Sequence, residues 1–276
     1  MQHIAQGPIS KMPAQLGEAV NYQLALGDER VDLNPYIGQM IRLSYLGEIN
    51  CSHCGRKTKK SFAQGYCYPC FSKLPQCDRC IMSPEKCHFH LGTCRDPQWG
   101  EQFCFQSHYV YLANSSGVKV GITRGTQIPT RWIDQGAIQA LPILKVDTRY
   151  QSGLVERVFA EHVTDKTNWR AMLKGQVDPL DMLAERDRLF DLCHEGLSGI
   201  EQEFGLQAIQ RLPDAEVVSI HYPVLNYPHK VATHNLDKTP VVEGVLQGIK
   251  GQYLILDTGV INVRKFTSYQ VEFSAG

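Results

Sequence analysis

The spacing of the cysteines is the feature that most limits how this chain can fold. Nine of the ten cysteines lie between residues 51 and 104, and most of them come in Cys-x2-Cys pairs. The first two pairs are separated by twelve residues, a spacing found in zinc ribbons and treble clefs. Each Cys-x2-Cys turn directs two thiolates at one ion, and a second turn completes a tetrahedron. We therefore expect a structural zinc ion held by Cys51, Cys54, Cys67 and Cys70.

Ten cysteines in 276 residues would also suit a disulfide framework in a secreted protein. The N-terminal sequence, MQHIAQGPISKMP, lacks the charged and then apolar order of a secretory signal. No run of about 18 apolar residues is present, so no membrane-spanning helix is expected. We expect a cytoplasmic protein, in which close cysteine pairs bind metal more often than they form disulfides.

A second group of possible metal ligands follows the first and offers more side chains than one zinc ion needs. A third Cys-x2-Cys pair supplies two thiolates, and two later cysteines are expected to complete a second site. All-cysteine ligation also suits an iron–sulfur cluster, but the irregular spacing does not favour one. So many thiolates indicate closed structural sites rather than catalytic zinc, which needs an open coordination position. The expected ligands are Cys77, Cys80, Cys87 and Cys94, with His88, His90, Cys104 and His108 as alternatives.

The loop between the first two cysteine pairs, GRKTKKSFAQGY, is basic and contains two aromatic residues. Cations interleaved with aromatic rings suit a phosphate backbone and stacked bases. The alternative is a solvated loop whose cations offset the negative charge of a four-thiolate zinc centre. The expected nucleic-acid-binding residues are Arg56, Lys57, Lys59 and Lys60, together with Arg124 further along the chain.

The stretch that follows the cysteine block predicts a β-hairpin and then a short helix. Residues 109–113 and 118–123 are rich in β-branched and aromatic residues, as strands are. Residues 114–117, Asn-Ser-Ser-Gly, supply turn chemistry between them. Pro129 suits the first turn of the helix that carries Arg131.

This hairpin resembles the core of the GIY-YIG nuclease superfamily, in which two strands hold the name-giving tripeptides. Tyr109-Val110-Tyr111 occupies the place of the first tripeptide, and Lys119-Val120-Gly121 followed by Thr123 occupies the place of the second. Tyr109 stands where the family has glycine, and Lys119 stands where it has tyrosine. The resemblance covers residues 105–175, about a quarter of the chain. The whole chain also resembles a group of bacterial proteins that join a cysteine-rich segment to this domain.

The resemblance implies a metal-dependent nuclease site on the hairpin and the helices after it. Glu156 would bind a catalytic magnesium or manganese ion, and Arg131 would clamp the phosphate. Tyr111 would help to activate the attacking water, although a phenol with a pKa of about 10 needs nearby positive charge to act at neutral pH. Lys119 would supply that charge or bind phosphate in place of the family's tyrosine. Asn168 would position the substrate or the metal-bound water.

The helix that carries Glu156 is expected to begin near Ser152, which would cap it. A third strand is predicted before it, at residues 141–146. Glu156 lies beside an apolar stripe with 3- and 4-residue steps, so its side chain could point into a cleft. The stripe comprises Leu154, Val155, Val158, Phe159 and Val163.

Charge around this site suits a phosphodiester. Residues 105–175 contain nine Lys and Arg against five Asp and Glu, whereas the whole chain has 28 of each kind and no net charge. Any nucleic-acid surface is therefore local rather than global. Each expected site residue also has a structural interpretation, as a core aromatic for Tyr111, a solvated cation for Arg131 or a turn cap for Asn168.

The order of the segments predicts an α+β protein. Residues 1–50 are expected to form short strands, residues 51–104 the zinc-binding module, and residues 105–175 a GIY-YIG-like domain with a small antiparallel sheet and flanking helices. Residues 176–213 predict supporting helices. Residues 214–276 return to strands, as a small barrel-like sheet that the N-terminal strands could complete.

Three functions are compatible with these patterns. The first is a metal-dependent endonuclease acting on DNA or RNA, with zinc modules that position the nucleic acid. The second is a catalytically inactive nucleic-acid-binding protein that keeps the fold, a hypothesis that Lys119 favours. The third is a zinc-stabilised interaction module without a nucleic-acid role. Salt-dependent binding separates the third from the other two, and turnover that is lost in Glu156→Ala separates the first from the second.

Overall fold

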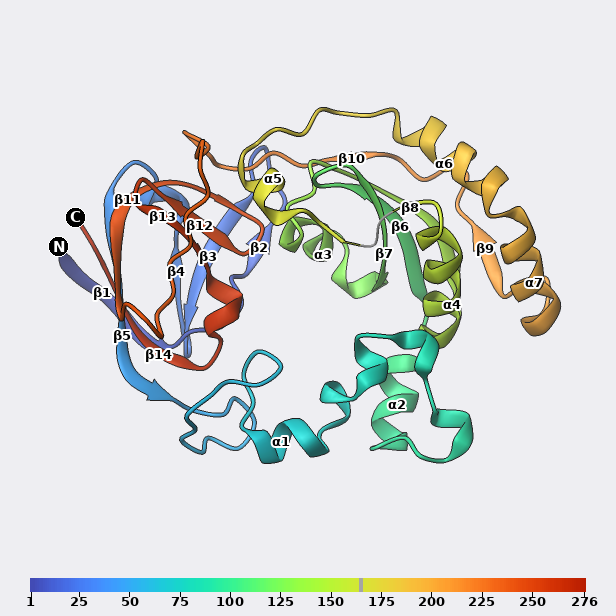
Figure 1. The fold of residues 1–276 in the computed structure, drawn as a ribbon, viewed down its shortest axis with the longest axis horizontal. Helices are drawn as coiled ribbons and strands as arrows, with labels where there is room; N and C mark the ends of the chain where they lie inside the picture. Colours follow the sequence, from blue (N-terminus) through green and yellow to red (C-terminus); the bar gives the residue numbers. More distant parts are fainter. Residues whose placement is uncertain (164–165) are drawn as a thin grey trace.

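The two ends of the chain meet in one body of antiparallel sheets, here called the sheet body. In the computed structural model, which describes residues 1–163 and 166–276, it contains β1 (Gln2–Pro8), β2 (Ala14–Gln15), β3 (Asn21–Leu26), β4 (Glu29–Asp32), β5 (Met40–Ile49), β11 (Val241–Lys250), β12 (Tyr253–Leu256), β13 (Gly259–Asn262) and β14 (Tyr269–Ala275). Six strands follow the order β1-β14-β5-β11-β12-β13, and β2-β3-β4 form a separate sheet that shares the same apolar core. The N- and C-terminal segments, which the sequence separates, are therefore one structural unit (Figure 1).

Alternation of buried and exposed side chains explains how these strands form. Along β11, Val242 and Leu246 face the core with the two-residue period of a half-buried strand. The register against β12 shifts between Leu246 and Gly248, and after this shift Ile249 is buried too. Gly251, at φ 61°, then turns the chain into β12, as the sequence predicts.

The second body is built around the predicted hairpin and is called the hairpin body. Its strands are β6 (His108–Asn114), β7 (Val118–Arg124), β8 (Gln139–Val146), β9 (Ile209–Arg211) and β10 (Val218–Ser219). They follow the order β10-β8-β6-β7, and β9 also pairs with β8. Its helices are α3 (Thr130–Asp134), α4 (Arg149–Ala160), α5 (Trp169–Leu173), α6 (Met182–Leu192) and α7 (His194–Phe204). The expected α+β class with antiparallel sheets and flanking helices is confirmed.

Helix α4 begins earlier than the sequence suggested. Thr148 is its N-cap, and the Thr148 hydroxyl accepts a hydrogen bond from the backbone nitrogen of Gln151 at 3.2 Å. Gln151 in turn accepts from the backbone nitrogen of Thr148 at 2.9 Å, which completes a capping box. Ser152 lies inside the helix and donates to the carbonyl oxygen of Arg149 at 2.7 Å, so the expected cap at Ser152 was wrong.

The cysteine segment, residues 51–104, bridges the two bodies (Figure 1). Its first half docks on the sheet body, where Ser61 and Ser268 donate side-chain hydrogen bonds to the carbonyl oxygens of Thr267 and Gly65. Its second half docks on α4, where a Cβ at Gly153 would lie 2.6 Å from the backbone nitrogen of Glu85. The helices of the segment are α1 (Tyr68–Lys73), η2 (Pro75–Cys77), η3 (Arg79–Ile81), η4 (Pro84–Lys86), η5 (Phe89–Leu91) and α2 (Pro97–Cys104).

Helix α3 ties the hairpin body directly to the sheet body. The Asp134 carboxylate, only 4% exposed, pairs with Lys11 at 2.6 Å and accepts a hydrogen bond from Gln252 at 3.0 Å. Gln252 also accepts from the backbone nitrogen of Met12 at 2.8 Å. Because these groups come from both terminal segments, α3 is held in a fixed position against the sheet body. Across residues 1–163 and 166–276, no helix has the length and apolar character needed to cross a bilayer.

Candidate functional site

The first cysteine group has the geometry of a metal site. The four sulfur atoms of Cys51, Cys54, Cys67 and Cys70 lie within 4.8 Å of one another. The first pair follows β5 in a turn, while Cys67 is the N-cap of α1 and Cys70 lies in its first turn. Two thiols are buried and two reach the surface, so the chain encloses the site from one side only. The predicted ligand set is brought together.

Electrostatics in this group favour a bound cation. Burial acts to raise the pKa of Cys51, but hydrogen bonds from the backbone of Cys54, Cys67 and His53 outweigh it and lower that pKa to about 6. Burial and the neighbouring sulfurs raise the pKa of Cys70 instead. Once one thiolate forms, a second one beside it is costly in the absence of a cation. A divalent ion such as zinc removes this cost, so the donor set fits a structural metal.

The second cysteine group surrounds a small cavity of about 20 Å³ beneath Phe89 and Trp99. Gly100 closes this cavity, and a Cβ there would lie 3.4 Å from the Cys94 sulfur. Burial, the charge of Asp78 and the charges of the neighbouring thiols raise the pKa of Cys80 to about 11. Thiols from four separate turns therefore share one environment. They are Cys80, Cys87, Cys94 and Cys104.

One of the four expected ligands is not among them. Cys77 is buried at the end of η2, and the charged groups that act on its thiol are Arg95 and Cys51. Cys77 does not line the second cavity, although its Cys-x2-Cys pairing suggested a shared role with Cys80. Cys104, one of the alternative ligands expected from the sequence, lines this cavity because α2 ends there.

The histidines considered as alternatives have other partners. His88 contacts the hydroxyl of Thr93 at 2.8 Å and the carboxylate of Asp78 at 3.4 Å. Asp78, Cys80 and His88 form a compact group, but Arg95 also pairs with Asp78, at 2.9 Å, which favours a structural network around the thiols. His90 lines a different pocket, and His108 bonds the carbonyl oxygen of Gln106 at 2.7 Å.

The centre of the hairpin is formed by Tyr111 and Gly121, which are directly opposite each other on β6 and β7. The Tyr111 side chain is fully buried and lies so close to Gly121 that a Cβ there would be 2.6 Å from the phenolic oxygen. The Tyr111 hydroxyl donates a hydrogen bond to Gln135 at 2.9 Å. Only glycine leaves room for the phenol at this position.

Arg131 on α3 and Glu156 on α4 act on the same phenol. Burial raises the pKa of Tyr111, the charge and hydrogen bond of Arg131 lower it, and the charge of Glu156 raises it. Arg131 and Glu156 therefore both lie within electrostatic range of Tyr111 at the centre of the hairpin body. Three of the five residues expected to carry catalysis are brought together.

Lys119 and Asn168 have more structural roles than expected. Lys119 is 4% exposed and donates a hydrogen bond to the hydroxyl of Thr167 at 2.6 Å. It faces the same side of the hairpin as Tyr111, because it pairs with Ala113, two residues after Tyr111 on β6. Asn168 is the N-cap of α5, and its side-chain oxygen accepts from the backbone nitrogen of Ala171 at 3.2 Å. The Asn168 carbonyl is thus occupied by the helix rather than turned to a substrate.

Two arginines lie where the cysteine segment meets the hairpin body. Arg124 and Arg149 line a pocket of about 340 Å³ together with the aromatic rings of Trp99 and Phe103. Trp99 stacks on Phe103 with centroids 4.8 Å apart, and the Arg124 guanidinium lies 5.5 Å from the Phe103 centroid. Arg124 was expected from the sequence, but Arg149 was not. Arg149 begins α4 and lines this pocket only because α4 packs against the cysteine segment.

Within the part of the chain that the structure describes, these arginines form no ion pair with a carboxylate. Burial lowers the pKa of Arg149. The charges of Arg124 and Arg131 lower this pKa further, whereas those of Cys104 and Cys80 raise it. Among residues 1–163 and 166–276, no ion pair joins Arg124, Arg131 or Arg149 to a carboxylate. Positive charge held this close without a counter-ion suits an anionic ligand.

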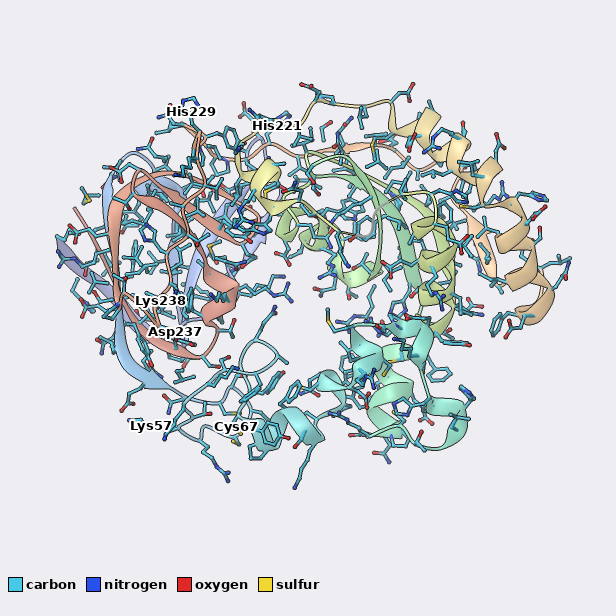
Figure 2. All side chains as sticks on the ribbon, viewed as in Figure 1. Lys57, Cys67, His221, His229, Asp237 and Lys238 are labelled. Carbon is cyan, nitrogen blue, oxygen red and sulfur yellow. The ribbon has the colours of Figure 1, made fainter. Side chains whose placement is uncertain are left out.

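The basic loop of the first cysteine site is open to solvent. Lys57 pairs with Glu48 at 2.6 Å, and the Lys60 ammonium lies 5.4 Å from the ring centroid of Phe62. Figure 2 shows Lys57 beside Cys67 at this corner of the molecule. The side chains are available for a partner, but the loop alone does not distinguish nucleic-acid binding from a solvated surface. The exposed cations are Arg56, Lys57, Lys59 and Lys60.

Most of the chain matches one known protein family. A family model described as "Protein of unknown function (DUF2797)" matches residues 38–271. The chain belongs to this family. The matched range contains the cysteine segment, the whole hairpin body and every candidate site residue described above. Neither the curated proteins nor the solved structures contain a match.

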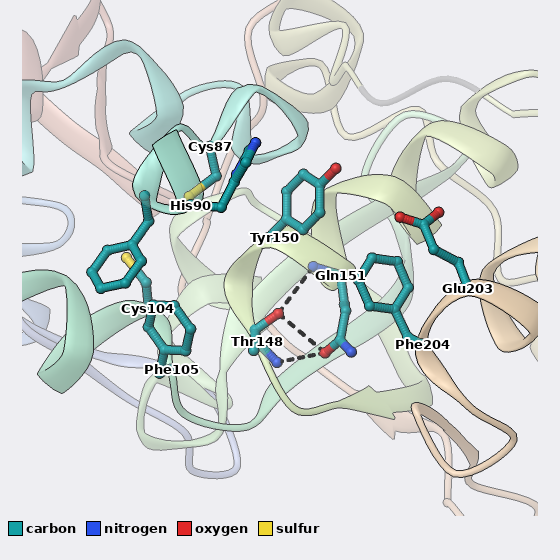
Figure 3. A pocket seen from close by; sticks show the side chains of 10 residues that line it. Cys87, His90, Cys104, Phe105, Thr148, Tyr150, Gln151, Glu203 and Phe204 are labelled. Atoms are coloured by element: carbon teal, nitrogen blue, oxygen red, sulfur yellow. Dashed lines mark hydrogen bonds between the residues drawn. The ribbon is translucent and has the colours of Figure 1, made fainter. Parts of the chain in front are cut away.

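A further pocket of this DUF2797 protein is apolar, and Tyr111 does not line it. It has a volume of about 460 Å³ and lies between the cysteine segment, α4 and α7. Figure 3 shows Tyr150 and Phe204 on one side of it and Cys87 and Cys104 on the other. Aromatic side chains dominate it and Glu203 is its only charged carboxylate, so it lacks the cations that the arginine pocket offers to an anion.

Proposed function

We propose that this protein is a metal-dependent nuclease that hydrolyses phosphodiester bonds of DNA or RNA. The observation that carries the proposal is that Arg131 and Glu156 both act on the buried phenol of Tyr111, which packs against Gly121. A phenol, a permanent cation and a carboxylate are the groups that a phosphodiesterase of the GIY-YIG type needs, and they come from a hairpin and the two helices after it. The two cations Arg124 and Arg149, which line one pocket, support an anionic substrate next to them.

Each of the three groups would have one role. Arg131 would bind two oxygens of the reacting phosphate, because its guanidinium is planar and remains charged. Glu156 supplies a single carboxylate, which fits a magnesium or manganese ion whose other ligands are water and phosphate oxygens. Such an ion would stabilise negative charge on the phosphate. With its pKa raised by burial, Tyr111 stays protonated at neutral pH and would act as a hydrogen-bond donor to an oxygen at the site.

The cysteine groups would position the substrate rather than react with it. We infer one zinc ion at the first group and a second at Cys80, Cys87, Cys94 and Cys104. The second site lies directly behind the arginine pocket, because Cys104 lines both cavities. Metal binding there would fix α2, and with it the Trp99 and Phe103 rings, against Arg124 and Arg149.

A non-catalytic nucleic-acid-binding protein is the second candidate. The observation that favours it is the burial of Tyr111, whose hydroxyl is already bonded to Gln135. Two further residues expected in the site, Lys119 and Asn168, also make hydrogen bonds inside the protein. Lys119 donates to Thr167, and Asn168 accepts from the backbone of Ala171. On this hypothesis the hairpin body would keep the anion-binding arginines without turnover.

Cleavage of labelled DNA and RNA in the presence of magnesium or manganese tests the proposal. The panel contains single strands, duplexes and branched substrates, and compares the wild-type protein with Glu156→Gln and Arg131→Gln. We expect both variants to reduce the cleavage rate by at least about 100-fold. The matched control is Glu161→Gln, which removes an exposed carboxylate at the end of the same helix and should cleave normally.

Binding measured on the same substrates distinguishes the two candidates. Cleavage that survives Glu156→Gln would assign the activity elsewhere or to a contaminant. Salt-dependent binding without cleavage by the wild-type protein would establish the non-catalytic alternative. Absence of both would leave the cysteine segment as a zinc-stabilised interaction module.

A further inference from the structure

A polar pocket of about 340 Å³ lies where α5 meets the sheet body, apart from the cysteine sites and the arginine pocket. Its walls come from the start of α5, from β12 and β13, from the loop before β11 and from η7 (Val263–Phe266). The loop is held in place, because the backbone nitrogen of His234 donates to the carbonyl oxygen of Val260 at 2.8 Å. This volume falls in the range of small-molecule sites.

Three cations line this pocket and no carboxylate does. They are Arg170, Lys238 and Lys265. Within the described residues, 1–163 and 166–276, none of the three forms an ion pair with a carboxylate. Asp237 precedes Lys238 on the sheet body (Figure 2), but its carboxylate accepts a hydrogen bond from Tyr269 at 2.8 Å and does not line the pocket. The charge in the pocket is therefore available to an anion.

Aromatic rings form one wall beside these cations. The rings of Trp169 and Tyr253 are nearly parallel, with an interplanar angle of 6° and centroids 5.9 Å apart. The Arg170 guanidinium lies 4.3 Å from the Trp169 centroid, which keeps the cation and the ring together. Planar rings backed by arginine are the platforms on which proteins stack nucleobases.

Two asparagines supply hydrogen-bonding groups at the same pocket. The side-chain oxygen of Asn235 accepts from the backbone nitrogen of Asp237 at 3.0 Å, and that of Asn262 accepts from the backbone nitrogen of Lys265 at 3.3 Å. These bonds hold both side chains in the wall of the pocket. Fixed amides of this kind can read the edge of a base.

We propose that this pocket binds a nucleoside phosphate, with the phosphate at Arg170, Lys238 and Lys265 and the base against Trp169. The ligand is either a free nucleotide or one nucleotide of a strand. The second source rests on the proposed function, since Trp169 lies two residues after Thr167, whose hydroxyl contacts Lys119 beside the candidate catalytic group.

Equilibrium binding without added magnesium or manganese tests this inference independently of cleavage. Ribonucleoside and deoxyribonucleoside monophosphates, inorganic phosphate and labelled single strands of about eight nucleotides are titrated against the wild-type protein and Lys238→Gln/Lys265→Gln. We expect the variant to bind nucleotide or strand at least tenfold more weakly, with a smaller salt dependence for the strand. The matched control is Lys230→Gln, an exposed lysine outside the pocket, which should bind normally. Thermal melting checks that each variant is folded.

The outcomes separate the two ligand sources and the two proposals. Tight binding of monophosphates identifies a free-nucleotide site, and binding of strands alone identifies a subsite for nucleic acid. Inorganic phosphate that competes as well as nucleotides would remove the base from the proposal and overturn it. Equal binding by the wild-type protein and the double variant would overturn it as well. Loss of cleavage in Glu156→Gln has no effect on any of these readings.

Discussion

The phenolic oxygen of Tyr111 lies 2.6 Å from the place that a Cβ at Gly121 would occupy. Two residues that pair across the hairpin thus share one volume, which tyrosine fills and glycine leaves empty. The contact fixes the phenol between Gln135 and Arg131. Both residues were expected at this site because they belong to the two tripeptides of the hairpin. The contact explains why the second tripeptide ends in glycine, since a larger residue would overlap the phenol.

Gly121→Ala should destabilise the protein by about 1–3 kcal/mol, because the added methyl group forces Tyr111 to move in a well-packed core. Chemical denaturation measures the change in the free energy of unfolding. Gly199→Ala is the control, since a Cβ there meets no atom within 4 Å and glycine inside α7 is unfavourable. Equal stability of Gly121→Ala and the wild-type protein would contradict the close contact.

Metal analysis of purified protein should give two zinc ions per chain, one for each cysteine group. Cys67→Ser should lose the ion of the first site, and Cys104→Ser should lose the ion of the second, because each removes one of four thiolates. Each loss should lower the melting temperature, since metal binding contributes directly to folding. Elemental analysis by mass spectrometry provides the count.

Cys77→Ser and Cys193→Ser are the matched controls for metal content. Cys77 lies outside the second cavity, and Cys193 packs between α6 and α7 in the hairpin body. Both variants should keep two ions. Loss of zinc from Cys77→Ser together with full occupancy in Cys104→Ser would restore the ligand set that the sequence favoured.

The two cysteine groups differ in how far the sequence alone defines them. The first site was predicted because two Cys-x2-Cys turns define a tetrahedron by themselves. In the second site each thiol comes from a different turn, so the choice between Cys77 and Cys104 depends on how α2 folds back over η3. Spacing along the chain contains no information on that packing.

The hairpin could be predicted because its pairing depends on residues that are close in the sequence. Its strands are close in sequence, and the turn at residues 114–117 fixes which residues pair. The cap of α4 was missed, because Ser152 was expected there, although Thr148 and Gln151 stand three residues apart as a capping box requires. Arg149, Trp169 and Lys265, in contrast, come from distant segments, and only the joined bodies reveal them as pocket residues.

Asp134→Ala should lower the free energy of unfolding by about 2–4 kcal/mol, because Asp134 is a buried and paired carboxylate. The substitution leaves Lys11 without its partner and removes an acceptor from Gln252, so the hairpin body loses a fixed contact with the sheet body. Urea denaturation gives the free energy of unfolding. Glu48→Ala, which breaks the exposed pair with Lys57, is the control and should cost less than about 1 kcal/mol. Similar losses in both variants would mean that the Asp134 network does not join the bodies.

Lys250 makes stability depend on pH in a direction that can be stated in advance. Its side chain is 1% exposed, and burial lowers its pKa to about 8, below the 10.5 of a free lysine. Between these two values the unfolded chain binds a proton that the folded chain does not, so stability rises with pH through this window. Below about pH 8 both states are protonated and the full cost of burying the charge is present. Tyr222 and Tyr227, each with its ring centroid 5.3 Å from the ammonium, offset part of this cost.

Lys250→Met should therefore stabilise the protein at pH 7, by roughly 1–3 kcal/mol, because it removes a buried charge and keeps the apolar volume. The advantage should shrink as the pH rises above 8, where the folded wild-type protein becomes neutral at this position. Urea denaturation at pH 7 and pH 9.5 measures both effects. Lys230→Met, at an exposed site, should show no such pH dependence. A less stable Lys250→Met at pH 7 would instead mean that the two tyrosine rings stabilise the ammonium by more than burial costs, and the lysine would then be a favourable part of the core.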